Sequence, residues 1–157
     1  MARAQLRNPE IKNLRGEIPI HSLYTAGVGG QLFFRALKEK GELVGTRCRP
    51  CKQVYLPARR FCERCFAELT DEIRVAPEGI VRGFTFCYVD HDGRRLKQPS
   101  GLALVQLEGA TTLLLHRLLD VDDPAHLSIG SRVKVVIKPK TKRTGSILDI
   151  EGFRLNP

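Results

Sequence analysis

The sequence predicts a mainly β protein with three parts: an N-terminal helical arm, a small module built on four cysteines, and a five-stranded barrel. Three observations predict this fold class. Four cysteines stand in two C-x2-C pairs, one short amphipathic segment precedes them, and a series of strand-like segments follows them. We predict the divisions at residues 1–42, 43–75 and 76–157.

The composition is that of a globular chain. The 157 residues suffice for one ordinary domain or two small modules. Hydrophobic residues make up 42% and charged residues 27%. No apolar run approaches the roughly 18 residues that cross a bilayer, and residues 1–9 lack an apolar signal core. We therefore expect a cytoplasmic protein that has no membrane contact.

The net charge of +9 is spread evenly along the chain. Residues 1–45, 46–75 and 76–157 each carry an excess of +3. This even division argues against one dedicated nucleic-acid face. One local run, from Arg132 to Arg143, holds six basic residues and no acid. We favour a solvated hairpin for this run over a polyanion contact.

The segment 29–40 is predicted to form a helix that ends at Gly41. Its apolar residues fall on one stripe, made up of Leu32, Phe33, Ala36 and Leu37. So short a helix cannot bury that stripe alone. We expect it to pack on the body of the protein, and a partner surface is the alternative. The preceding Gly-Val-Gly-Gly at residues 27–30 follows no clear strand, so a hinge is favoured over a phosphate-binding loop.

The four paired cysteines are the candidate metal ligands: Cys48, Cys51, Cys62 and Cys65. A C-x2-C turn lets two thiolates converge on one ion, and the second turn completes a tetrahedron around zinc. The sequence therefore predicts a zinc ribbon with one structural zinc per chain. Four protein ligands leave no open position for a substrate. The same ligands could hold iron, as in a redox protein, and metal analysis distinguishes the two.

Five strand-like segments follow the ribbon, at residues 80–89, 102–107, 112–118, 132–137 and 146–155. A tight hairpin at residues 109–110 joins the second and third, and a longer connection at 120–130 joins the third and fourth. Five strands with a long third connection predict a small Greek-key barrel of the OB type.

The sequence offers no catalytic set. The four histidines are scattered and lie in no nucleophile or metal motif. The unpaired Cys87 lies in a strand between Phe86 and Tyr88, so an inert buried thiol is favoured. We predict no catalytic residues, and the residues that would bind a cofactor other than zinc are unknown.

The combined pattern resembles a known family. A helix with Phe-Phe-x-Ala-Leu leads to Gly-Glu-Leu-x4-Cys, whose cysteine opens the first of the two C-x2-C pairs. After the pairs come the motifs Gly-x-Val-x-Gly-Phe-Thr and Leu-x-Ile-Gly-x-x-Val-x-Val. Over residues 20–155 the chain is similar to the rubredoxin-like zinc-ribbon/OB-fold proteins associated with acyl-CoA enzymes, the domain of unknown function thirty-five. The family often has glycine where this chain has Lys52, and a Pro-Pro pair where it has Leu56-Pro57. Both departures bear on turn geometry.

The resemblance implies a non-catalytic scaffold subunit in a hetero-oligomer with a thiolase-superfamily enzyme: a thiolase, synthase or aldolase, or else a hydratase. The zinc would be structural, and a CoA ester could be shared with the partner. Only the four cysteines transfer from the family by motif. A net positive charge favours the approach of the CoA phosphates.

Two alternatives stay open. A zinc ribbon and an OB barrel can also bind single-stranded nucleic acid, with Phe84, Phe86 and Tyr88 as candidate stacking residues. We expect these aromatic side chains to pack in the barrel core instead, so nucleic-acid binding is the less favoured hypothesis. The other alternative is an enzyme or redox protein in its own right.

Overall fold

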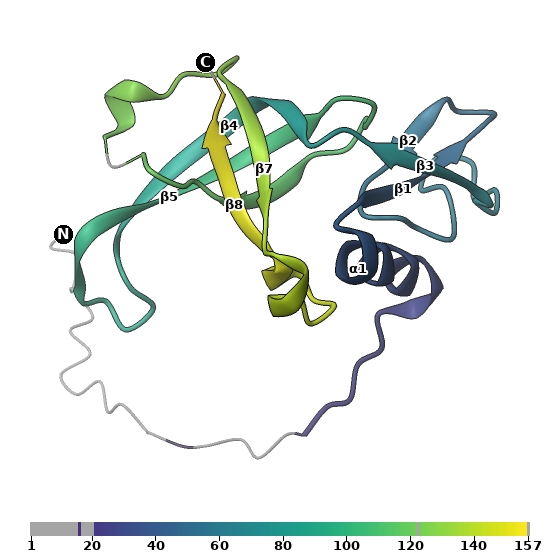
Figure 1. Cartoon of the computed structure of the whole chain (residues 1–157), viewed down its shortest axis with the longest axis horizontal. Coiled ribbons are helices and arrows are strands. Elements are labelled where there is room, and N and C mark those ends of the chain that lie inside the picture. The colour runs from purple at the N-terminus through teal and green to yellow at the C-terminus, as the bar shows by residue number, and fades with distance from the viewer. Residues whose placement is uncertain (1–15, 17–20, 122, 157) are drawn as a thin grey trace, which may run out of the picture.

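The structure is a computed structural model, which describes residue 16, residues 21–121 and residues 123–156. Its elements form two sheets and one α-helix (Figure 1). The mainly β class with a helix, a cysteine ribbon and a following five-stranded barrel is confirmed. Residues 1–15 and 17–20 of the predicted arm lie outside the described residues. The divisions near residues 42 and 75 stay predictions.

The helix α1 (Gly27–Lys40) ends where the sequence indicates. Gly41 takes up the left-handed conformation, with φ of 70°, and its amide bonds back to the helix. Phe33 and Leu37 are fully buried, which confirms that the stripe packs on the protein's own body. The helix begins at Gly27, two residues before the predicted start at residue 29. Gly29 lies against the ribbon, where a Cβ would stand 2.6 Å from the carbonyl oxygen of Ala58. This glycine therefore serves a close approach instead of a hinge.

The ribbon is a three-stranded antiparallel sheet in the order β2-β1-β3. Strand β1 (Leu43–Cys48) pairs with β2 (Gln53–Tyr55) on one side and with β3 (Asp71–Val75) on the other. The first cysteine turn joins β1 to β2, and the second lies between β2 and β3. The register pairs Cys48 with Gln53 and Thr46 with Tyr55.

The barrel is a five-stranded sheet in the order β6-β5-β4-β7-β8. Its strands are β4 (Glu78–Val89), β5 (Arg95–Leu107), β6 (Leu114–Arg117), β7 (Arg132–Ile137) and β8 (Ile150–Leu155). The amide of Leu119 donates to the carbonyl of Phe153 at 2.8 Å, which brings the β6 end to β8 and closes the sheet. The outer part of the β4–β5 hairpin extends away from the ribbon (Figure 1).

Two of the predicted barrel strands are wrong at one end. Strand β5 begins seven residues earlier than predicted, at Arg95, because it pairs with β4 along the extended hairpin, where Val89 faces Arg95. Strand β8 begins later, at Ile150, because residues 147–149 form a 3-10 turn. The turn at Gly109 and the long connection from Asp120 are confirmed. The hairpin between β5 and β6 is not tight, because residues 108–113 separate the strands and Thr111 and Thr112 bond to Val54 and Leu56.

Two clusters of buried side chains meet along β2. The larger cluster fills the barrel and includes Val54 and Leu56, whereas the smaller one surrounds the cysteines and includes Tyr55. Successive side chains of a strand point to opposite sides. Strand β2 and the residue after it therefore form a shared wall between the ribbon and the barrel.

The connection between β7 and β8 is built around one buried carboxylate. Asp149 is fully buried and accepts hydrogen bonds from the amides of Thr144 at 2.8 Å and Gly145 at 2.7 Å, and from the Thr144 hydroxyl at 3.2 Å. Burial alone would raise the pKa of Asp149, but these donors together hold it below the ordinary value. The turn lies against α1, since a Cβ on Gly145 would stand 3.3 Å from Lys38.

No helix within the described part of the chain combines the length and the apolar character needed to cross a membrane.

We predict that Asp149→Asn lowers the free energy of unfolding by about 1–3 kcal/mol at pH 7, because the amide cannot accept every bond that the charged carboxylate accepts. The folded-state pKa is depressed, so the stabilisation is complete above the ordinary pKa of 3.8 and is lost as the pH falls through the folded-state value. Urea unfolding at pH 7 and near pH 3 measures both effects.

The control is Asp120→Asn, which removes an ion pair with Arg154 at a side chain that is 70% exposed. That exposed pair should contribute little. Equal losses of stability in the two variants would contradict the role assigned to Asp149.

Candidate metal centre and surface

The four predicted ligands come together in space. The Sγ atoms of Cys48, Cys51, Cys62 and Cys65 all lie within 4.8 Å of one another, and the Sγ atoms of Cys48 and Cys65 are 3.5 Å apart. The thiols are free of disulfides. Zinc–sulfur bonds of about 2.3 Å in a tetrahedron would place the sulfurs about 3.8 Å apart. The donor set and its spacing therefore fit one zinc ion.

Both cysteine turns use the same backbone conformation. Lys52 follows the first pair with φ of 54°, and Phe66 follows the second pair with φ of 58°. Both angles lie in the left-handed region, which suits glycine best. The family's preference for glycine at Lys52 thus has a conformational reason, and this chain adopts the same turn with a longer side chain.

One side chain outside the cysteine set bonds to a sulfur among the described residues. The hydroxyl of Tyr55 lies 3.2 Å from the Sγ of Cys62, and the amide of Arg64 donates to the same sulfur at 3.4 Å. The hydrogen bond from Tyr55 is the main reason that the pKa of Cys62 is lowered to about 6. The same contact raises the pKa of Tyr55 to about 12. Sequence motifs did not point to this residue, because tyrosine belongs to no ligand motif.

The thiols of Cys48 and Cys51 hold their protons more tightly until a cation is present. Hydrogen bonding with Cys65 and burial raise the pKa of Cys51 to about 12. The pKa of Cys48 is also raised: its largest influence, the backbone hydrogen bond at Cys51, acts to lower it but is outweighed by burial and the neighbouring thiols. A zinc ion would displace these protons, and its two charges would leave a four-thiolate site at about −2.

Some of the basic side chains of the ribbon and of the basic run form salt bridges with nearby carboxylates. Arg49, next to the ligand Cys48, pairs with Asp71 at 3.3 Å. In the basic run of the barrel, Arg132 pairs with Glu108 at 3.1 Å and Lys134 with Glu78 at 2.9 Å. The run is therefore partly neutralised, which agrees with the solvated hairpin that the sequence favoured.

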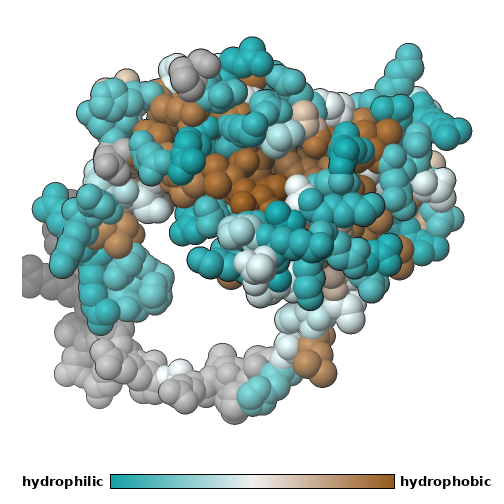
Figure 2. Space-filling view, viewed as in Figure 1, coloured by the Kyte–Doolittle hydropathy of each residue, from teal (hydrophilic) through white to brown (hydrophobic). Residues whose placement is uncertain are grey.

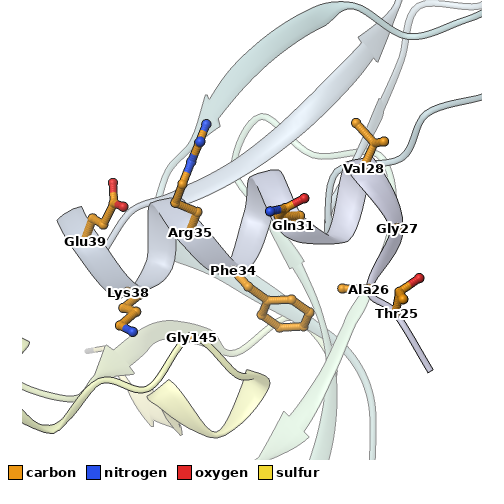
Figure 3. A pocket seen from close by; sticks show the side chains of 10 residues that line it. All are labelled: Thr25, Ala26, Gly27, Val28, Gln31, Phe34, Arg35, Lys38, Glu39 and Gly145. Carbon is orange, nitrogen blue, oxygen red and sulfur yellow. The ribbon is translucent and has the colours of Figure 1, made fainter. Parts of the chain in front are cut away.

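A hollow of ≈ 710 Å³ lies beside α1. Phe34 and Lys38 point from the helix toward the turn that carries Gly145, and Arg35 and Glu39 point the other way (Figure 3). The lining mixes both charges and brings together no nucleophile with a base, as acyl or proton transfer would require. The hollow is therefore best described as a gap between the helix and the turn that carries Gly145, and not as an active site.

The aromatic candidates for base stacking divide into two groups. Phe84 and Phe86 are partly buried against the barrel core and stack edge to face at 6.2 Å, as the core interpretation predicted. For Tyr88 that interpretation is wrong, since the ring is 52% exposed on the extended hairpin. Cys87 beside it is half-buried.

An apolar groove of ≈ 410 Å³ crosses the outer face of β4, β5 and β6. Leu104 and Leu115 face each other across β5 and β6, and they are 39% and 58% exposed. The groove is lined by Gly83, Phe84, Thr85, Leu102, Leu104 and Leu115. Apolar surface also gathers over the barrel in the view of Figure 2, surrounded by hydrophilic residues. The sequence did not reveal this groove, because strand alternation does not tell which apolar residues lie on the outer face.

The fold and the cysteine site define a protein that joins a zinc ribbon to an OB barrel. Comparison with family models agrees: the ChsH2 rubredoxin-like zinc ribbon domain matches residues 35–71, and the ChsH2 C-terminal OB-fold domain matches residues 72–138. Together the two models span well over half of the chain. The chain belongs to this zinc-ribbon/OB-fold family, the DUF35 family, as the sequence motifs predicted.

Two curated relatives are DUF35 domain-containing scaffold proteins. The protein of Methanocaldococcus jannaschii is 27% identical over 79% of this chain and 87% of its own length. That of Methanothermobacter thermautotrophicus is 22% identical over 79% of this chain and 92% of its own. Both alignments extend over 125 residues.

Two solved structures share the fold. One is a DUF35-family protein of unknown function from Sulfolobus solfataricus, with TM-score 0.65 and 24% identity over 83% of this chain and 87% of that one. The other is a chain of an Ltp2-ChsH2(DUF35) aldolase, with TM-score 0.56 and 23% identity over 79% of this chain and 91% of that one. At these identities the likeness establishes the fold.

We predict that the purified chain carries about one zinc ion and that Cys62→Ser abolishes zinc retention, because serine is a poor ligand and leaves three thiolates. The matched control is Cys87→Ser, which lies outside the cluster. Elemental analysis after gel filtration measures the zinc. Iron with a visible absorption band, or unchanged zinc in Cys62→Ser, would contradict the assignment.

Proposed function

We propose that the chain is a non-catalytic scaffold subunit of a thiolase-superfamily acyl-CoA enzyme. The scaffold role is supported by the two curated relatives, which are scaffold proteins. The partner class is supported by the aldolase assembly in which a similar chain takes part. The partner would supply the catalytic residues, since the described residues of this chain bring together no catalytic set.

The observation that carries the proposal is the apolar groove on the barrel. Soluble monomers seldom leave large apolar patches uncovered. Removing a leucine side chain from water stabilises by about 1.5–3 kcal/mol. Leu104 and Leu115 stand side by side on rigid strands, so their backbone positions need no ordering on binding. A partner surface that covers them would gain affinity at little entropic cost.

The charge pattern around the groove adds selectivity. On β4, Arg82 bonds to Gln106 at 3.0 Å, and on β6, Arg117 bonds to the carbonyl of Glu151. Arg82 precedes the groove residue Gly83 on β4, and Arg117 on β6 pairs with the groove residue Leu102 on β5. The favoured partner surface is therefore apolar at its centre and acidic at its rim.

A CoA ester shared with the partner is the further part of the proposal. The chain carries a net +9, and a positive field attracts the CoA phosphates. Binding of CoA would require both proteins, because no described hollow combines an apolar cleft with a cluster of free cations. Calorimetry with CoA on the free chain and on the complex tests this part: affinity for CoA in the free chain equal to that of the complex would contradict it.

Capture of partners with the tagged full chain from its native cytosol tests the proposal as a whole. We expect one thiolase-superfamily enzyme in stoichiometric amount, identified by mass spectrometry. Recovery of single-stranded nucleic acid that elutes with salt would favour the alternative of a nucleic-acid binder. An enzyme that reaches full activity without this chain, and forms no complex with it, would refute the scaffold role.

We predict that Leu104→Asp together with Leu115→Asp weakens the complex by about 30-fold or more, since each change places a charge in a desolvated contact. Surface plasmon resonance with the captured enzyme measures the dissociation constant. The control is Ile129→Asp, at a side chain 69% exposed in the connection between β6 and β7. Equal dissociation constants for both variants would exclude the groove as the docking surface.

A further inference from the structure

We infer that Tyr55 is a positioning residue of the metal centre, and that the OB barrel holds it in place through Thr111 and Thr112. This inference rests on the proposal that the four cysteines hold zinc. It assigns to the barrel a part in metal retention, although all four ligands belong to the ribbon.

The contact between Tyr55 and the site is buried and specific. Tyr55 is fully buried, Cys62 is 1% exposed, and the phenol oxygen stands 3.2 Å from the sulfur. The guanidinium of Arg59 lies over one face of the ring, 5.1 Å from its centre. The buried ring has its hydroxyl aimed at one sulfur, so the hydroxyl donates to Cys62 whenever that sulfur is a thiolate.

The hydrogen bond from Tyr55 would offset part of the negative charge of a four-thiolate site. Such a site carries a net charge of about −2, and the sulfur of Cys62 lies away from water. A buried donor that offsets part of that charge stabilises the metal-bound state. Outer donors of this kind typically change metal affinity by about 10- to 100-fold.

The barrel fixes the backbone on both sides of Tyr55. Val54 exchanges amide and carbonyl bonds with Thr111: its amide donates to the Thr111 hydroxyl at 2.9 Å, and its carbonyl accepts from the Thr111 amide at 2.9 Å and hydroxyl at 3.0 Å. Leu56 is held in the same way, since its amide donates to the Thr112 hydroxyl at 2.8 Å and its carbonyl accepts from it at 2.9 Å.

These five bonds join β2 to the connection between β5 and β6. Val54 and Leu56 also bury their side chains in the barrel core, while Tyr55 points into the cysteine cluster. The barrel therefore determines the position of the Tyr55 phenol, and the phenol is hydrogen-bonded to the sulfur of Cys62. Loss of the threonine contacts should therefore weaken metal retention, although neither threonine side chain bonds to a sulfur.

The test is the rate of zinc release from the full zinc-loaded chain to a chromophoric chelator. We expect Tyr55→Phe to release zinc about 10-fold faster than the wild type, and Tyr88→Phe, on the exposed hairpin, to release it at the wild-type rate. Thr111→Val with Thr112→Val should also release zinc faster, against Thr141→Val, an exposed residue, as control.

A second readout reports on the sulfur itself. In the cobalt-substituted chain, the sulfur-to-cobalt charge-transfer bands should shift in Tyr55→Phe and stay in place in Tyr88→Phe. Unchanged release and unchanged bands in Tyr55→Phe would overturn its role. Wild-type release from the threonine double variant would overturn the role of the barrel.

Failure of the zinc proposal has a different signature, since the wild type itself would then retain neither zinc nor cobalt. If Tyr55→Phe does not fold with metal, the single variant Thr112→Val tests the inference, because it leaves the ribbon's own residues intact. A faster zinc release than in Thr141→Val would support the inference. A zinc release rate equal to that of Thr141→Val would overturn it.

Discussion

The ribbon is too small to stabilise itself by burying apolar surface, and the rest of the structure depends on how this is compensated. Its own buried cluster consists of Cys48, Tyr55, Cys62 and Leu69. Modules of this size ordinarily need a metal or disulfides to fold. Two of the four core residues are also candidate ligands, so a bound ion would join the strands where a larger domain has a hydrophobic core. The metal and the core are thus one structural feature.

The neighbouring parts are fixed relative to the ribbon through close backbone approaches. On one side α1 rests on the ribbon where Gly29 meets Ala58, and on the other it meets the β7–β8 connection at Gly145. That connection keeps its shape because Asp149 gathers the amides of Thr144 and Gly145. The helix is therefore wedged between ribbon and barrel. Such a molecule can present a surface of constant shape, which suits a scaffold better than a hinge would.

Sequence patterns determined the parts of the structure that depend on local rules. The C-x2-C spacing located Cys48, Cys51, Cys62 and Cys65, and strand alternation with turn signals located five strands and their order along the chain. What depends on contacts distant in sequence was missed. The bond from Tyr55 to Cys62 requires the ribbon to be folded, and Thr111 reaches Val54 across 57 positions. The outer apolar groove was hidden because Leu104 and the buried Val105 look alike in sequence.

The location of exposed apolar surface distinguishes between an enzyme, a nucleic-acid binder and a subunit of an enzyme complex. In an enzyme, apolar surface and polar groups converge in one cleft. In this chain they are separated across the described residues: the cysteines lie in the ribbon, and the apolar strip of Leu104 and Leu115 lies on the outside of the barrel. A nucleic-acid platform would place several free aromatic faces among cations, yet Phe84 and Phe86 are partly buried against the core, and of the three candidates Tyr88 alone is an exposed large side chain. An outward apolar strip on a rigid sheet is instead what a protein surface covers, and this is why we favour a subunit of a larger enzyme.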